Sequence, residues 1–182
     1  MVRPPRAGTR YFSGCDPSGG ARDSFTLAVS HNENSAAILD CVVEIKPPFN
    51  PTAATVQMAD VLRSYGLTKT VGDHYGAEWI VDAMAKVGIK YEHSDRDRSA
   101  IYLDALPMFT AGRVRLLDNP RLVSQFAALE RRTSPNGRDR VDQGHRSWRP
   151  TCSERAKPTR RIAHVVAHSR KSGADHNAEF HQ

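Results

Sequence analysis

Hydrophobic and polar residues alternate along the first quarter of the chain with the period of two that is typical of half-buried strands. Strands are predicted over residues 11–16, 25–31 and 36–45, and the segments between them are short and polar. Consecutive strands joined by short turns pair antiparallel. We therefore expect the first three strands to form a meander.

The hydrophobic period changes after Lys46-Pro47-Pro48, where two prolines interrupt the strand pattern. Asn50 and Ser94 are expected to cap helices, Pro107 to kink or break one, and residues 133–142 to form a polar hairpin. Helices are predicted over residues 51–65, 76–87, 94–111 and 120–129, and short strands over residues 67–73, 89–93 and 114–117.

The order of these elements is three strands, then helices alternating with single strands. This order is typical of the ribonuclease H-like fold. We therefore expect an α/β protein whose mixed sheet is an antiparallel three-strand meander followed by parallel strands, flanked by helices.

The chain of 182 residues suits one domain, which we place at residues 10–142 after a loose leader at residues 1–9. The remaining residues, 143–182, hold 8 Lys/Arg against 3 Asp/Glu, and so carry most of the net charge of +6. Only 11 of these 40 residues are hydrophobic, against 60 of the 142 before them. A basic, poorly packed tail is expected there.

The three cysteines have neither metal-ligand spacing nor a disulfide framework, which favours a reducing, cytoplasmic setting. No apolar run approaches the roughly 20 residues that span a bilayer, and the first nine residues do not resemble a signal peptide. No membrane association is expected.

Two aspartates end predicted strands. Asp16 is followed by Pro17 and a glycine pair, and Asp73 by a short segment before a helix. Chemistry in α/β sheets sits at the carboxyl ends of strands, and two carboxylates converging there repel each other unless a cation lies between them. Paired Mg²⁺ ions about 3.5–4 Å apart serve in-line attack on a phosphodiester. Alternatively, Asp16 starts an Asx turn and Asp73 caps the following helix.

Several short motifs support the first interpretation. They are Asp16-Pro17-Ser18-Gly19-Gly20 followed by Asp23-Ser24, Val71-Gly72-Asp73 followed by Tyr75-Gly76, and the segments 99–103, 112–118 and 137–142. In this order and spacing, residues 10–142 resemble the C-terminal nuclease domain of phage terminase large subunits. The resemblance implies an endonuclease with two Mg²⁺ or Mn²⁺ ions that cuts concatemeric double-stranded DNA in the host cytoplasm, with the phage portal and the small terminase subunit as partners. The ATPase loop Gly-x-x-x-x-Gly-Lys-Ser/Thr is absent from the sequence.

Asp16 and Asp73 match the first two metal-binding, catalytic acids of that family. The third acid is expected shortly after a Val-Asp that matches Val141-Asp142, but no acid follows until Glu154. Asp142 is therefore the candidate third metal ligand, with Asp139 and Glu154 as further candidates. Three basic residues are expected to hold the DNA backbone without reading its sequence: Lys69, Arg96 and Arg98.

The departure from the family pattern has one further interpretation. The codons around Trp148 allow Gly-His-Gly-Asp in another reading frame, so the tail can be out of frame and the chain a truncated or impaired prophage copy. His164 and His168 lack a third ligand and are not expected to bind metal. The alternatives are a non-catalytic DNA-binding or assembly remnant of the same fold, and another ribonuclease H-like nuclease of the resolvase or transposase type.

Overall fold

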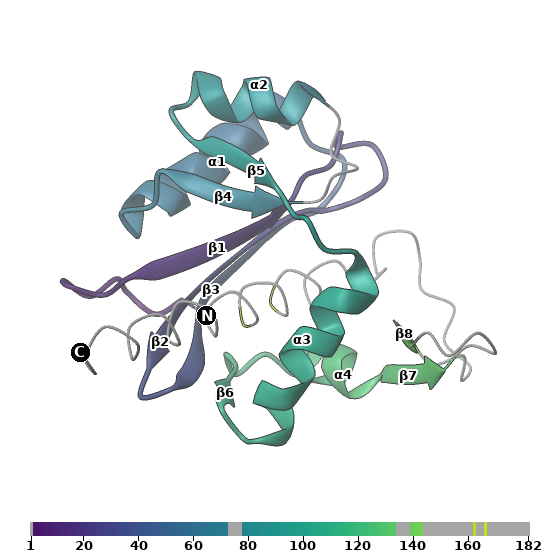
Figure 1. Ribbon diagram of the computed structural model, residues 1–182. Helices are drawn as coiled ribbons and strands as arrows, with labels where there is room; N and C mark the ends of the chain where they lie inside the picture. Colours follow the sequence, from purple (N-terminus) through teal and green to yellow (C-terminus); the bar gives the residue numbers. More distant parts are fainter. Residues whose placement is uncertain (1, 73–77, 134–138, 144–161, 163–165, 167–182) are drawn as a thin grey trace.

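The first three strands of the chain form an antiparallel meander (Figure 1). The structure, a computed structural model, describes residues 2–72, 78–133, 139–143, 162 and 166. The meander consists of β1 (Tyr11–Asp16), β2 (Phe25–Glu33) and β3 (Ala36–Ile45). Polar turns join these strands, and each strand pairs with the next one along most of its length. The predicted meander is confirmed.

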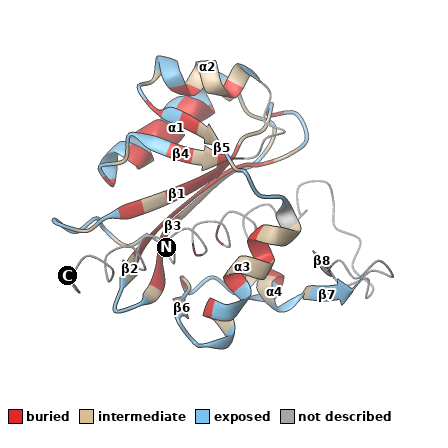
Figure 2. Cartoon of the chain, in the orientation of Figure 1, coloured by how far each residue is buried: buried red, intermediate tan, exposed pale blue. Residues whose placement is uncertain are grey.

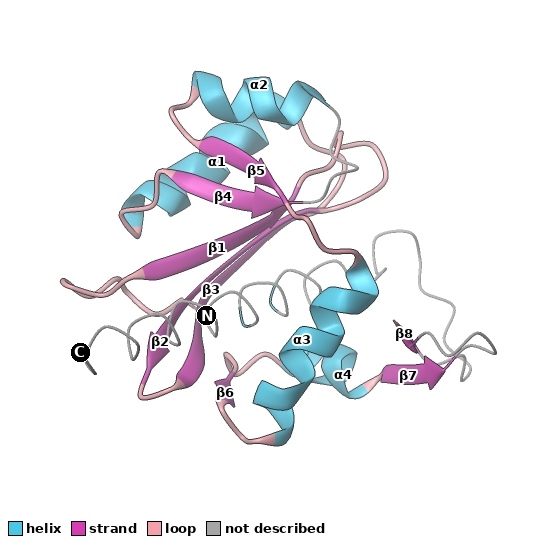
Figure 3. Ribbon diagram, in the orientation of Figure 1, coloured by secondary structure: helices cyan, strands magenta, loops and turns pink. Residues whose placement is uncertain are grey.

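Helices and short strands alternate after the meander. They are α1 (Pro51–Ser64), β4 (Lys69–Gly72), α2 (Glu78–Lys86), β5 (Lys90–His93), α3 (Arg98–Thr110), β6 (Val114–Arg115), α4 (Pro120–Ala127), β7 (Leu129–Thr133) and β8 (Asp139–Gln143). Strand β4 pairs parallel to β1, β5 parallel to β4, and β6 parallel to β3, giving the sheet order β5-β4-β1-β2-β3-β6. Strands β7 and β8 form a separate antiparallel hairpin (Figure 3).

This mixed sheet, antiparallel and then parallel and flanked by helices, is the predicted ribonuclease H-like architecture. Side chains that alternate along β2 pack on opposite faces of the sheet. Phe25, Leu27 and Val29 join one hydrophobic cluster with α1 and α2. Ala28 joins a second cluster with α3 and α4. Figure 2 shows the buried residues concentrated along the central strands and on the inner sides of these helices.

The predicted cap of α3 is wrong, and the predicted break at Pro107 is not found. The carboxylate of Asp97, rather than Ser94, caps the helix by accepting a hydrogen bond from the Ala100 N–H at 2.8 Å. Pro107 does not break the helix, since α3 continues to Thr110, while a kink at this position stays a prediction. Buried apolar residues on both sides of the proline, Ile101 and Met108 among them, hold the helix on the sheet despite the missing N–H.

The N-terminal segment is attached to the sheet rather than loose. Val2 forms a β-bridge with Cys41, and the N–H of Arg3 donates to the carbonyl of Asp40 at 2.8 Å. The hydroxyl of Tyr65 donates to the carbonyl of Arg3 at 2.6 Å. The expected loose leader is therefore wrong for residues 2–3, because their backbone extends the ladder of β3.

Two described residues belong to the tail. Ile162 and Val166 are both helical and 0% exposed, and both pack in the second cluster, beside α3 and α4. Because i and i+4 share one helix face, they present one apolar stripe. The expectation of a poorly packed tail is wrong at these two positions, and their burial counts against an out-of-frame tail. Glu154, His164 and His168 lie outside the described residues.

None of the described helices is both long enough and apolar enough to cross a membrane.

Candidate active site

Asp16 ends β1 and is buried, at 8% exposed. Pro17 has no N–H to continue the ladder, so the strand stops there. The loop that follows is fastened at Gly20, whose carbonyl accepts a hydrogen bond from the Phe49 N–H at 3.1 Å. Gly20 has φ of 82°, and a Cβ there would overlap the carbonyl oxygen of Phe49. Glycine is therefore required for this close approach, which fixes the chain immediately after Asp16.

Strand β4 brings the second candidate segment to the same edge. Gly14 pairs with Val71 and Cys15 with Gly72, in parallel register. The two strands are therefore adjacent as far as Gly72. Asp73 lies outside the described residues, so the convergence of its carboxylate with that of Asp16 remains a prediction.

Gly72 has no side chain, and a side chain of β5 occupies the space beside it. The hydroxyl of Tyr91 occupies the position that a Cβ of Gly72 would take. The Ser94 N–H donates to the carbonyl of Gly72 at 2.8 Å and extends the β4–β5 ladder by one step. The end of β4 is therefore held from both sides, by β1 and by β5.

A transverse row of polar side chains crosses the sheet at Asp16. Thr26 on β2 lies opposite Asp16, and Glu44 on β3 lies opposite Thr26. Residues directly opposite each other on paired strands share one face. By strand alternation this is the face covered by α3 and α4, because Ala28 packs there. Glu44 forms an ion pair with Arg121 of α4, with 3.0 Å between Oε2 and Nη1.

Two hydroxyls near Asp16 are buried without partners. Thr26 is 0% exposed and Ser24 is 2% exposed, and neither hydroxyl has a hydrogen-bond partner in the described part of the chain. Leaving such a group unpaired is unfavourable, so unsatisfied buried hydroxyls indicate a place for a water or an ion.

The side chains near Asp16 offer the type of ligand atom, oxygen, that a hard divalent cation prefers. Mg²⁺ prefers oxygen ligands, and the carboxylate of Asp16 and the hydroxyl of Thr26 supply oxygen. Among the side chains that the structure describes, which exclude those of Asp73, Asp139 and Asp142, no three His, Cys, Asp or Glu form a metal-binding group. A complete site therefore needs ligands beyond Asp16.

Asp142, the candidate third ligand, lies in β8 with its backbone opposite Glu130. The hairpin is fastened to α3 at the neighbouring position, where the Val141 N–H donates to the Ser99 hydroxyl at 3.4 Å. The side chains of Asp139 and Asp142 lie outside the described residues, so their role as ligands remains a prediction.

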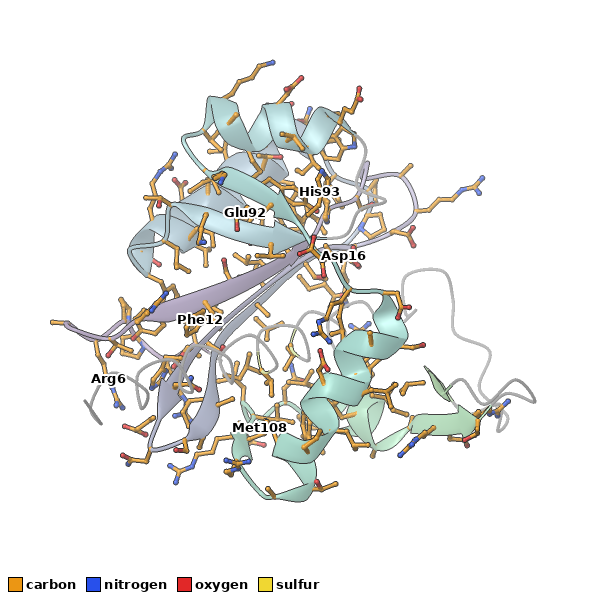
Figure 4. All side chains as sticks on the ribbon, in the orientation of Figure 1. Arg6, Phe12, Asp16, Glu92, His93 and Met108 are labelled. Atoms are coloured by element: carbon orange, nitrogen blue, oxygen red, sulfur yellow. The ribbon has the colours of Figure 1, made fainter. Side chains whose placement is uncertain are left out.

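The predicted DNA contacts occupy different places. Lys69 begins β4, at the opposite end of that strand from Gly72, and lies 3.5 Å from Glu92. The pKa of Glu92 is lowered, first by its hydrogen bond from Lys90 and further by Lys69. Arg96 forms an ion pair with Asp104 of α3. The side chain of Arg98 lies outside the described residues, and DNA binding by all three stays a prediction. Figure 4 marks Asp16 at the strand ends and Glu92 on β5.

Three residues at this site are not predicted from the sequence: Thr26 and Glu44 of the transverse row, and Arg121, which pairs with Glu44. The period-two pattern indicates which face Thr26 takes within its own strand. The pairing register that places it opposite both Asp16 and Glu44 cannot be deduced from that pattern, because it depends on the turn geometry and on a bulge in β3.

The sequence matches no family model, and no curated protein matches it. Solved structures with the same fold do match. The magnesium-bound large terminase nuclease of thermophilic phage G20c superposes with a TM-score of 0.73 at 14% identity, over 92% of this chain and 85% of that one. The HK97 bacteriophage large terminase gives 0.61 at 14% identity, over 95% of this chain and 41% of that one. A mutant nuclease domain of the Sf6 large terminase, solved with manganese and beta-thujaplicinol, gives 0.62 at 11% identity, over 88% and 89% of the two chains.

Two of these structures are large terminase nucleases and the third is a large terminase, and the similarity in fold covers 88–95% of this chain. The chain described here therefore has the ribonuclease H-like fold of phage large terminase nuclease domains.

Proposed function

We propose that this chain is a metal-dependent DNA endonuclease domain of a phage DNA-packaging terminase, acting on concatemeric double-stranded DNA. One observation supports it most strongly: β1 and β4 run parallel and adjacent, with Cys15 opposite Gly72. The two predicted acids, Asp16 and Asp73, each directly follow one of these paired residues. In the proposed setting the domain works in the bacterial cytoplasm, with the portal and the small terminase subunit as partners.

In this proposal Asp16, Asp73 and a third acid hold Mg²⁺ or Mn²⁺. When bound, two such ions activate a water and stabilise the leaving oxygen of a phosphodiester. Asp16 is well suited to its part because its strand is fixed on both sides and its side chain is mostly shielded from solvent. The hydroxyl of Thr26 offers a second oxygen, as the Ser/Thr hydroxyl does on Mg²⁺ in phosphate-binding loops.

The absence of a third acid at the expected position lowers the rate of cleavage that we expect. No acid stands where the resemblance requires one, and Asp142 is the nearest substitute in sequence. A ligand misplaced by 1 Å can cost about a hundredfold in rate. We therefore propose an impaired nuclease, with activity at or below about a hundredth of an intact relative and higher with Mn²⁺ than with Mg²⁺.

The experiment is cleavage of linear duplex DNA by the purified chain, with Mg²⁺, Mn²⁺ or EDTA. We expect slow cleavage that requires metal and is abolished in Asp16→Asn and in Asp73→Asn. Asp60→Asn is the matched control, because Asp60 is an exposed aspartate on α1 that pairs with Arg63. Cleavage that persists in Asp16→Asn while metal is required would contradict the site assignment.

The missing acid also favours a second candidate, a non-catalytic DNA-binding remnant of the same fold. That candidate predicts DNA binding without any cleavage in Mg²⁺ or Mn²⁺. The same assay, paired with a binding measurement in EDTA, separates the two.

A further inference from the structure

Arg121 is joined to the row of the sheet that holds Asp16. The register places Asp16, Thr26 and Glu44 directly opposite one another on three neighbouring strands. Glu44 accepts a hydrogen bond from the guanidinium of Arg121 at 3.0 Å. Arg121 of α4 is thereby held at the same end of the strands as Asp16, the candidate metal ligand.

The length of this row corresponds to a few nucleotides of one DNA strand. Neighbouring strands lie about 4.8 Å apart, so Asp16 and Glu44 are separated by roughly 10 Å across two strand intervals. Phosphates in one DNA strand recur about every 3.4 Å along the helix axis. A duplex cut at Asp16 would therefore present to Arg121 a phosphate a few nucleotides from the scissile one.

Arg121 has the chemistry and the exposure for such a contact. Its side chain is 39% exposed, and its bond to Glu44 engages one of the five N–H donors of a guanidinium. The remaining donors form a planar fork that matches two phosphate oxygens. Arg121 also lies in the first turn of α4, which Asn119 caps by accepting from the Leu122 N–H, so the helix end adds partial positive charge.

The two predicted contacts whose side chains are described, Lys69 and Arg96, are not joined to the row. Lys69 lies at the far end of β4 from Gly72, and Arg96 pairs with Asp104 on α3 rather than with a residue of the row. The ion pair of Arg121 is different, because its partner Glu44 is itself a residue of the row that contains Asp16.

We propose that Arg121 is a DNA-phosphate contact and that Glu44 is the positioning residue that orients it. The inference rests on the proposed function, because it assumes a DNA substrate. Arg121 then fixes the duplex across the sheet, and Asp16 stands at the bond to be cut. The contact is to the backbone, so it carries no sequence preference.

The test is the affinity of the full chain for a fluorescently labelled duplex, measured by anisotropy in EDTA over a range of salt concentrations. We expect Arg121→Gln to weaken binding about five- to tenfold and to reduce the slope of log K against log salt by about 1. Arg121→Lys should retain the slope with an intermediate affinity. Arg63→Gln is the matched control, because Arg63 also pairs with a carboxylate, Asp60, but lies on α1 on the other face of the sheet. Thermal unfolding of each variant checks that it folds.

Glu44→Gln tests the positioning role. Removing a negative charge beside DNA would strengthen binding if only net charge mattered, whereas loss of the orienting ion pair should weaken it two- to fivefold. Stronger binding by Glu44→Gln would overturn the positioning role. If Arg121→Gln binds DNA as tightly as the wild type, or if Arg63→Gln loses as much affinity, Arg121 is not a DNA contact. Metal-dependent cleavage by the wild type would in that case still support the proposed function. A wild-type chain that neither binds nor cuts DNA would overturn both.

Discussion

The hydroxyl of Thr26 is the residue-scale feature that most directly concerns the site. It is buried opposite Asp16 without a hydrogen-bond partner in the described part of the chain. Such a group costs about 1–3 kcal/mol relative to a satisfied one, and Thr26 differs from other unpaired hydroxyls, such as those of Ser30 and Thr70, in lying directly opposite the candidate carboxylate. A bound cation or its water would supply the missing partner.

Replacing Thr26 with valine tests this idea, because valine has nearly the same shape without the hydroxyl. We expect the free energy of unfolding without metal to stay equal or to rise by about 1 kcal/mol, since an unpaired hydroxyl is removed. We expect Mn²⁺ affinity, measured by calorimetric titration, to fall several-fold. Ser30→Ala is the control, because Ser30 has the same kind of buried hydroxyl on β2, farther from Asp16. Equal Mn²⁺ affinity in the wild type and in Thr26→Val would show that the hydroxyl takes no part.

Single residues were predictable from the sequence where their role is local. Asn50 caps α1 as expected, accepting from the Ala53 N–H at 3.0 Å, because a cap depends on residues three positions away. The cap of α3 was assigned to Ser94 instead of Asp97, because both residue types are good caps and the sequence does not fix the first turn. Asp16 was predicted at its strand end, whereas Glu44 and Arg121 required the register across three strands and a helix.

At the scale of elements, β2, β3 and the N-terminal segment form one unit around a buried ionisable pair. Nδ1 of His31 and Oδ2 of Asp40 are 2.6 Å apart, and both side chains are buried. The ring of Tyr11 packs edge-on against His31 at 5.6 Å. The backbone N–H of Arg3 donates to the carbonyl of Asp40, which ties the N-terminal segment to the strand that carries this pair. Burial raises the pKa of Asp40, and the bond to His31 only partly offsets that effect.

The raised pKa of Asp40 makes the stability of this unit depend on pH. The folded state holds the Asp40 proton more tightly than the unfolded state, whose pKa is near 3.8. Its contribution is therefore fully present below that value and is lost as pH rises through the folded pKa. We expect the stability of the wild type relative to Asp40→Asn, measured by urea unfolding at a series of pH values, to decline from about pH 4 upward. A relative stability that rises with pH would show that the charged pair with His31 dominates instead.

Most element boundaries followed from period and turn chemistry. The strands at residues 11–16 and 36–45 have the predicted ends, because turn residues bound each of them. Pro107 shows the limit of local rules, since packing of the buried face of α3 outweighs the missing hydrogen bond. The hairpin starts earlier than predicted, at Leu129, because charged residues of β7 are exposed and give no alternating pattern.

At the scale of the whole molecule, the order of strands and helices was enough to predict the sheet and its class of fold. The order does not indicate which distant segments complete the core. Val2 and Arg3 pair with β3, and Ile162 and Val166 join the cluster beside α3. Both segments are rich in basic residues, so composition suggested that they lie outside the core. Two apolar residues four positions apart lie on one helix face, so they can join a core even within a stretch of low overall hydrophobicity.

The last prediction concerns that segment. If Ile162 is part of the native core, Ile162→Ala should reduce the free energy of unfolding by about 2–5 kcal/mol, because it leaves a cavity in the cluster that contains Ile101 and Leu122. In a chain of this size, each 1 kcal/mol corresponds to about 2–4 °C in Tm. The measurement is urea and thermal unfolding of the full chain.

Val123→Ala is the matched control, because Val123 on α4 is 50% exposed and its truncation should change stability by less than about 0.5 kcal/mol. A tail translated out of frame would not have been selected to pack, and it would make Ile162→Ala as mild as the control. A large loss in Ile162→Ala together with a small one in Val123→Ala would establish that the basic tail is an integral part of the fold. Any shortfall in nuclease activity would then trace to the missing acid near Asp142 rather than to an unfolded C-terminal segment.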